Sequence, residues 1–346
     1  MEENDTQKNK HVFNIEVAPS HLFNNLAMDH RWLYFIHNSE SKPRIISINK
    51  SYLDVNNNDE NKKICSPPLS VNETNEMLIA KMITFNDNNN NVSYIAVGLY
   101  GGFKLWSRDG SRLLFQIPAK TQQTKPYAFL SITEYQMNSN EQNGKYDSIL
   151  CGDNYGQLFL VSGQLSKWKS KLIYNANNAM GITSIAATAN GKYVGLTFDK
   201  NSIALITINN TEMKNNVIIK ENALALTSGI VTSNINENNQ YFCCGFINGE
   251  IKVYDFITNT ALFCIHSNLR IINALTTYKN NIFSVGDDGS LNVWSVDFDS
   301  MEFALKCNEV YEDRMLVGIV YDETSKRIFS TAYDFNELIC LTNIDL

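Results

Sequence analysis

The sequence has few of the residues and motifs on which most catalytic sites depend. Five of its 346 residues are histidine, and four of the five lie within the first 40 positions. It contains no Gly-rich phosphate loop of the P-loop type, no G-x-S-x-G and no H-E-x-x-H. His21, His30 and His37 lie near one another, yet no acidic or cysteine residue stands at ligand spacing from them. We therefore expect no catalytic residue, no metal and no other cofactor.

Long apolar runs are also missing. No run approaches the roughly 18 residues that a membrane-spanning helix needs. The opening segment MEENDTQKNK lacks the apolar core of a signal peptide. We expect a soluble, cytoplasmic protein that does not insert into a membrane.

Paired cysteine spacing is absent. The seven cysteines form no C-x-x-C pair and stand mostly inside patterns typical of β-strands: Cys65, Cys151, Cys243, Cys244, Cys264, Cys307 and Cys340. A free cysteine in such a place behaves as a small apolar residue. We interpret them as reduced core residues rather than as a zinc site or a disulfide framework.

Positive charge is scarce. The formal net charge is -7 and the pI is near 5.3, which argues against sequence-independent nucleic-acid binding. The segment KWKSK places Lys167, Lys169 and Lys171 on one face of a predicted strand. We interpret it as a solvated outer strand protected from edge pairing, and an acidic docking partner is the alternative.

One unit recurs between residues 95 and 344. It consists of an apolar run, a small residue, a tight turn and a second apolar run, as in FSVGDDGSLNVWSVD (283 to 297) and FCCGFINGEIKVYDF (242 to 256). The unit recurs at 95 to 110 and at 149 to 163, and more weakly at 193 to 209 and at 328 to 344. A degenerate copy is WLYFIHNSESKPRIISIN (32 to 49). Repeated β-hairpins cannot bury their apolar faces singly and must stack on their neighbours.

The spacing of the copies predicts the fold. Equivalent small residues stand at Gly98, Gly152, Thr197, Gly245, Gly286 and Ala332. The intervals are close to the repeat of about 40 to 45 residues of a four-stranded propeller blade with insertions. We predict an all-β, seven-bladed propeller over residues 11–346, as one domain after a flexible segment over residues 1–10.

Short runs before the hairpins complete the predicted blades. AFLSITEYQ at 128, GITSIAATA at 181, RIINALTTY at 270 and MLVGIVYDE at 315 would each form an innermost strand. Nothing after the last hairpin is left to form an outer strand, whereas HVFNIEVAP (11 to 19) is a surplus β-like segment. We predict that residues 11–17 close the ring as the outer strand of the last blade.

Asparagine-rich patches interrupt the pattern. They lie at 55 to 63, 85 to 92, 137 to 145 and 208 to 216. We interpret them as polar loop insertions between strands or at strand ends.

The repeats resemble WD40 repeats, and the final third of the chain resembles the C-terminal region of the WD repeat-containing protein 54 family. The residues that carry the resemblance are HSNLRIINALTTYKNNIFSVGDDGSLNVWSVD, STAYDFNELICLTNIDL, ICSPPLS, FNNLAM and YDFNEL. The resemblance implies a single-propeller scaffold without enzymatic activity, cytoplasmic and associated with cilia and intraflagellar transport.

WD repeats often link their blades through a His, Ser, Asp and Trp hydrogen-bond set. His266, Asp288 and Trp294 stand at matching positions, and we expect them to have structural roles. Val285 stands where the serine is expected, and Ser284 is one position away, on the opposite strand face. We expect a partial network in this blade and packing alone in the others.

Aromatic residues recur at the turns between the second and third strands. We predict that these turns share one rim and expose a broken ring of partner-binding residues: Tyr100, Tyr155, Phe198, Phe246, Tyr333 and Phe335, with Arg270 and Asp287 nearby. Exposed aromatics and arginines are enriched in binding hot spots. The alternative is that each aromatic packs back against a neighbouring blade.

The residues together favour a monomeric, non-enzymatic scaffold for protein partners. A propeller enzyme with a hydrolytic site in the central channel is one alternative, and it needs several acidic or histidine side chains at the inner strand tips. A reader of peptides or modified histones is another. A phosphoinositide-binding propeller needs an adjacent arginine pair, which the sequence does not contain.

Overall fold

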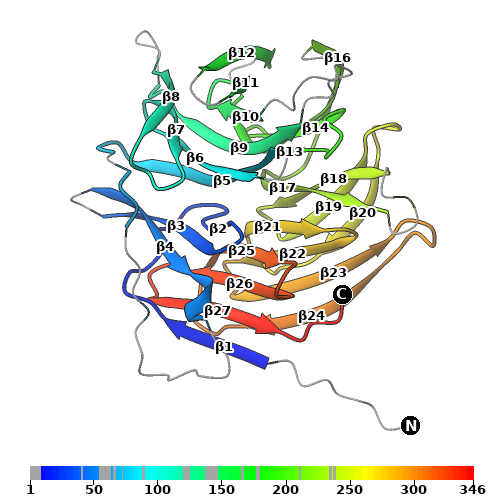
Figure 1. The fold of residues 1–346 in the computed structure, drawn as a ribbon. Coiled ribbons are helices and arrows are strands. Elements are labelled where there is room, and N and C mark those ends of the chain that lie inside the picture. Colours follow the sequence, from blue (N-terminus) through cyan, green and yellow to red (C-terminus); the bar gives the residue numbers. More distant parts are fainter. Residues whose placement is uncertain are drawn as a thin grey trace.

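The computed structural model describes residues 9–39, 42–53, 64, 68–71, 73–87, 90–119, 125–136, 147–164, 167–176, 180–209, 212–233, 236 and 239–346. Seven antiparallel sheets surround a central channel (Figure 1). Six sheets have four strands, and the first has three among the described residues. The predicted seven-bladed propeller is confirmed.

The strands follow the same order in successive blades, from the channel outward. Blade 1 contains β2 (Ala27–Met28), β3 (Trp32–Asn38) and β4 (Pro43–Asn49), followed by a 3-10 turn over Lys50–Tyr52. Blade 2 contains β5 (Met77–Asp87), β6 (Asn90–Leu99), β7 (Gly102–Ser107) and β8 (Leu113–Pro118). Blade 3 contains β9 (Phe129–Gln136), β10 (Asp147–Asp153), β11 (Gln157–Gln164) and β12 (Lys167–Asn175).

The remaining blades repeat this arrangement. Blade 4 contains β13 (Ile182–Ala187), β14 (Tyr193–Phe198), β15 (Ser202–Asn209) and β16 (Glu212–Lys220). Blade 5 contains β17 (Ala225–Thr232), β18 (Gln240–Phe246), β19 (Glu250–Asp255) and β20 (Ala261–His266). Blade 6 contains β21 (Ile272–Tyr278), β22 (Asn281–Gly286), β23 (Ser290–Asp297) and β24 (Glu302–Val310).

The last blade joins the two ends of the chain. Strands β25 (Leu316–Asp322), β26 (Arg327–Ala332) and β27 (Glu337–Thr342) come from the C-terminal end. The N-terminal strand β1 (Asn9–Asn14) pairs antiparallel with β27, from Asn9 opposite Thr342 to Asn14 opposite Glu337 (Figure 1). The predicted closure is confirmed, although the strand begins and ends a few residues earlier than the expected 11–17.

The core lies mainly between neighbouring blades. One cluster joins Phe283 and Leu291 of blade 6 to Leu316 and Ile328 of blade 7, and all four side chains are fully buried. Each sheet thus covers the apolar face of the next. This explains why the repeats are stable only as a closed set.

Two glycines show why the repeat keeps a small residue at each hairpin. Gly289 has a φ of 73°, a left-handed conformation that suits the turn between β22 and β23. Gly245 has ordinary backbone angles, but a Cβ there would lie 2.8 Å from the Cγ2 of Ile272 in the next blade. The first glycine is required by the turn and the second by blade packing.

The cysteines follow the sequence interpretation with one exception. The structure describes six of the cysteines, and Cys151, Cys243, Cys244, Cys307 and Cys340 are buried. Burial raises the pKa of the Cys243 thiol to about 12, so this side chain stays uncharged. Cys264 is exposed on the outer strand β20, and Cys65 lies outside the described residues.

Other predicted segments differ from expectation. Most of the expected flexible segment over residues 1–10 lies outside the described residues, while Asn9 and Lys10 belong to β1. Within the asparagine-rich stretch 208 to 216, residues 208–209 belong to β15 and residues 212–216 to β16, where Asn215 pairs with Thr207. The patches at 137 to 145 and at 55 to 63 lie outside the described residues. On β12 the three lysines of KWKSK are exposed and Trp168 is buried, as the alternation predicted.

Candidate functional site

One face of the ring is defined by a repeated backbone hydrogen bond. In blades 2 to 7, the first residue after the second strand donates its amide to a carbonyl just before the innermost strand of the same blade. The donors are Tyr100, Asn154, Asp199, Ile247, Asp287 and Tyr333, at distances from 2.8 to 3.3 Å. The turns and the connections therefore share one rim, as predicted. We call this rim the turn face.

These bonds also fix which residues stand at the turn tips. Tyr100 and Tyr333 are tip residues, with 43% and 41% of their surface exposed. Phe198 and Phe246 each precede a tip by one position, as the last residues of β14 and β18, and both are buried in the core. The expectation that these two phenylalanines are exposed on the rim is wrong, because a strand residue at that position points between the blades.

The other aromatics of the predicted ring are partly buried. The Tyr155 hydroxyl lies 2.8 Å from the Lys125 carbonyl, to which it donates, and it accepts from the Lys125 amide. The ring of Phe335 lies 3.7 Å from the guanidinium carbon of Arg314. Both residues lie on the turn face but are held by neighbouring groups.

The predicted polar residues flank a hollow between blades 6 and 7. Arg270 is exposed, and Asp287 accepts a hydrogen bond of 2.6 Å from the side-chain Nδ2 of Asn273. The hollow has a volume of about 470 Å³ and is lined by Leu269, Arg270, Asp287, Asp288, Asp313, Arg314 and Met315. Arg270 and Asp287 thus line the same hollow on the turn face.

The most exposed apolar side chain on this face is one that the sequence interpretation missed. Leu269 is 91% exposed at the edge of the hollow. Its amide donates to the Asp288 carboxylate over 2.6 Å, which fixes the backbone below it. An apolar side chain held clear of the core at this point is accessible to a partner.

Further apolar and aromatic groups extend from the hollow toward blade 1. The Tyr333 amide bonds to the Met315 carbonyl, and the His21 ring lies 5.3 Å from the Tyr333 ring and 6.2 Å from the Phe23 ring. We define the turn-face patch as Leu269, Arg270, Met315, Tyr333, His21 and Phe23. Tyr100 and Tyr155, in blades 2 and 3, do not belong to it.

The structural hydrogen-bond set of blade 6 is present, but with different members. Trp294 Nε1 donates to Ser267 Oγ over 2.7 Å, and Ser267 Oγ lies 2.8 Å from Ser284 Oγ. Ser284 donates to Asn268, whose amide donates to Asp288 over 3.1 Å. Asp288 and Trp294 therefore have the expected roles, and Ser284 belongs to the set rather than to the opposite face.

The structural role expected for His266 is wrong. Its side chain is 81% exposed, with Nδ1 3.8 Å from a Glu250 oxygen. The cause is the alternation along β20, in which Phe263 and Ile265 point inward and Cys264 and His266 point outward. The residue that bonds to the tryptophan is the next one, Ser267.

Three other blades carry an ion pair at the corresponding place. Glu73 pairs with Lys104 in blade 2 and Glu221 with Lys252 in blade 5, each at 2.6 Å. In blade 7, Arg314 forms two hydrogen bonds to Glu337, of 2.9 and 3.1 Å. Each pair ties the connection that enters a blade to the third strand of that blade. The expectation that the other blades depend on packing alone is therefore wrong for these three.

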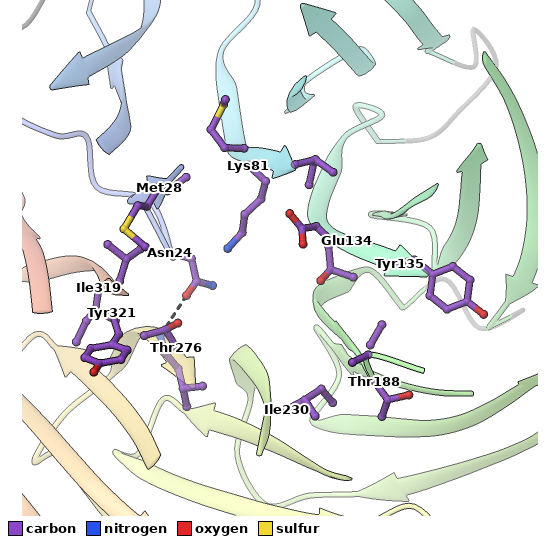
Figure 2. A pocket seen from close by; sticks show the side chains of 18 of the residues that line it. Asn24, Met28, Lys81, Glu134, Tyr135, Thr188, Ile230, Thr276, Ile319 and Tyr321 are labelled. Atoms are coloured by element: carbon purple, nitrogen blue, oxygen red, sulfur yellow. Dashed lines mark hydrogen bonds between the residues drawn. The ribbon is translucent and has the colours of Figure 1, made fainter. Parts of the chain in front are cut away.

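The central channel is lined mainly by small, hydroxyl and aliphatic side chains. Two adjoining cavities, of about 550 and 400 Å³, share Asn24, Lys81, Thr133, Glu134, Ala187, Ile230, Leu275 and Thr276 (Figure 2). Of the described residues that line them, Lys81 and Glu134 carry charge. The described residues contain no group of three or more His, Cys, Asp or Glu placed to hold a metal ion. The channel thus lacks the acidic cluster that a hydrolytic site needs among these residues.

Comparisons with known proteins identify the architecture. No protein-family profile and no curated protein matches the sequence, so the finer resemblance to the WD repeat-containing protein 54 family is not supported. The fold is similar to a chain of the solved structure described as "Crystal Structure of Mitotic Checkpoint Complex", with a TM-score of 0.68 and 13% identity over 100% of this chain and 95% of that one. Since 1530 solved chains match the fold, this likeness shows the propeller fold and does not indicate a specific function. The described residues include no helix with the length and apolar character needed to cross a membrane.

Proposed function

We propose that this protein is a non-enzymatic scaffold that captures protein partners on the turn-face patch. The observation that carries the proposal is Leu269, which is 91% exposed at the edge of a hollow that Met315 also lines, and the Tyr333 amide bonds to the Met315 carbonyl. A leucine that contributes nothing to the core gains free energy only when another surface covers it.

The charges around the hollow indicate which partner segment fits. The carboxylates of Asp287 and Asp288 already accept hydrogen bonds from Asn273, Asn268 and the Leu269 amide. Arg270 is exposed at the same edge, and a guanidinium there suits a carboxylate of the partner. A segment with an apolar residue for Leu269 and an acidic residue for Arg270 would match both groups.

The fold supports the same proposal. A propeller holds its turns on a rigid closed ring, so binding costs little ordering of the protein. The likeness to a chain from a multi-protein complex is consistent with partner binding. The expectations of a monomer in the cytoplasm, associated with cilia, belong to this proposal. They are testable by light scattering and by imaging of a fluorescent fusion.

A comparison of two matched variants tests the proposal. The first changes the patch by Leu269→Ala, Arg270→Ala and Tyr333→Ala. The control changes Ile257→Ala and Met301→Ala, which are 77% and 50% exposed on turns between third and fourth strands, at the opposite face. Affinity purification with quantitative mass spectrometry should show partners lost from the patch variant and kept by the control, with both melting near wild type. Equal partner sets for the two variants would contradict the proposal.

A further inference from the structure

Among the described residues that line it, the central channel holds one pair of opposite charges, on neighbouring innermost strands. Lys81 lies on β5 of blade 2 and Glu134 on β9 of blade 3. The Thr84 amide donates to Glu134 Oε1 over 3.0 Å, which fixes the carboxylate against the wall between these blades. The carboxylate is turned toward the opening of the channel (Figure 2).

The Lys81 ammonium points into the opening between Glu134 and Asn24 (Figure 2). It has no hydrogen-bond partner among the described residues, and Glu134 acts on it through space. The surroundings are costly for a charge, because the loss of water around it lowers the pKa of Lys81 and raises that of Glu134. A ligand that forms ion pairs with both side chains would offset this desolvation cost.

Asn24 supplies a third group with a fixed orientation. Its Oδ1 accepts a hydrogen bond of 3.1 Å from the Leu275 amide. The Asn24 Nδ2 is therefore turned toward the cavities as a donor. The channel thus presents two donors, Lys81 Nζ and Asn24 Nδ2, beside one acceptor, the Glu134 carboxylate.

We propose that the channel binds a small zwitterion of the free amino-acid type. The ligand's carboxylate would accept from Lys81 and Asn24, and its ammonium would donate to Glu134. A simple anion would meet repulsion from Glu134, and a simple cation repulsion from Lys81, so neither matches the pair. The cavities, of about 550 and 400 Å³, have room for such a ligand and are lined by Thr133, Thr276 and aliphatic groups.

Titration of the full chain with three probes tests this site. L-alanine carries both charges, acetate only the carboxylate and ethylammonium only the amine. Calorimetry at constant ionic strength should show saturable binding of L-alanine and about tenfold weaker or no binding of either half-ligand. Equal responses to all three probes, or no response to L-alanine at tens of millimolar, would overturn the proposal.

Near-isosteric variants assign the binding to the channel. Glu134→Gln and Lys81→Met should each weaken L-alanine binding at least about tenfold. The controls Lys306→Met and Glu312→Gln remove the same charges from exposed positions outside the channel and should bind as wild type. Circular dichroism checks that each variant folds, and Lys81→Gln replaces Lys81→Met if the latter does not. Wild-type affinity in folded channel variants would contradict the assignment.

Discussion

The Lys252 ammonium lies 2.6 Å from one carboxylate oxygen of Glu221, and the Tyr254 hydroxyl donates to the other over 2.7 Å. Glu221 precedes the innermost strand of blade 5, whereas Lys252 and Tyr254 belong to its third strand. The pair therefore ties the connection that enters blade 5, on the turn face, to the third strand of that blade. Lys104 and Glu73 repeat the arrangement in blade 2.

Removal of Glu221 should destabilise the ring. Glu221→Ala leaves the Lys252 ammonium and the Tyr254 hydroxyl without their acceptor in a largely buried place. We expect the free energy of unfolding to fall by about 2 kcal/mol. Urea denaturation measures the loss. Glu250→Ala is the control, because Glu250 lies 4.0 Å from Lys252, and it should cost well under half as much. Equal losses would show that the short pair has no special role.

The hydrogen-bond set of blade 6 predicts opposite outcomes for two adjacent residues. Ser267→Ala removes the acceptor of Trp294 and should cost about 1 to 2 kcal/mol. His266→Ala changes an 81% exposed side chain and should stay within about 0.5 kcal/mol of wild type. Thermal unfolding of both variants measures the two losses. If the hydrogen-bond set were centred on His266, His266→Ala would cost more than Ser267→Ala.

Asp29 makes the stability of the ring depend on pH. Burial alone would raise its pKa, but the amides of Arg31 and Trp32 donate to it over 2.7 and 2.8 Å. The Tyr34 hydroxyl also donates to Asp29, and the guanidinium of Arg108 in blade 2 lies 2.9 Å from its carboxylate. Together these groups outweigh the effect of burial and lower the pKa of Asp29 below its usual 3.8.

The sign of the effect follows from the lowered pKa. Asp29 contributes stability that is complete above its unfolded pKa of about 3.9 and is lost as the pH falls through its folded pKa. Asp29→Asn should therefore destabilise the protein at neutral pH, and the difference from wild type should shrink below about pH 4. Denaturant unfolding across this range measures both curves. A difference that grows toward acid would contradict this role.

Closure of the ring by β1 predicts a large cost for one side chain. Phe13 is buried in a cluster with Phe35 of blade 1 and Phe329 of blade 7. Phe13→Ala should reduce the free energy of unfolding by about 3 kcal/mol. Leu172→Ala, on the outer strand of blade 3 but exposed, is the control and should cost little. Similar losses of unfolding free energy for the two variants would mean that the packing of β1 does not stabilise the closed ring.

The sequence predicts most of the architecture because the hairpins repeat and one strand is left over at the N-terminal end. It places the turn tips less well. Strands β14 and β18 have buried residues on both faces, so no alternation shows whether Phe198 or Asp199, or Phe246 or Ile247, stands at the tip. The backbone bonds of Asp199 and Ile247 settle that register.

The candidate sites were harder to predict for a different reason. Leu269 lies in a connection without a repeat pattern, and only the structure shows that it points away from the core. Lys81 lies on β5, which was not among the innermost strands that the sequence identified. Its position beside Glu134 arises because β5 and β9 are neighbours around the channel.

Site-specific photo-crosslinking tests the central claim most directly. A photoreactive phenylalanine replaces Tyr333 in the turn-face patch in one protein and Ile257 on the opposite face in another, and both are irradiated in cells. The account predicts that the Tyr333 probe crosslinks to a defined partner and that the Ile257 probe does not. Crosslinks to the same protein from Ile257 alone, or from both positions equally, would contradict it.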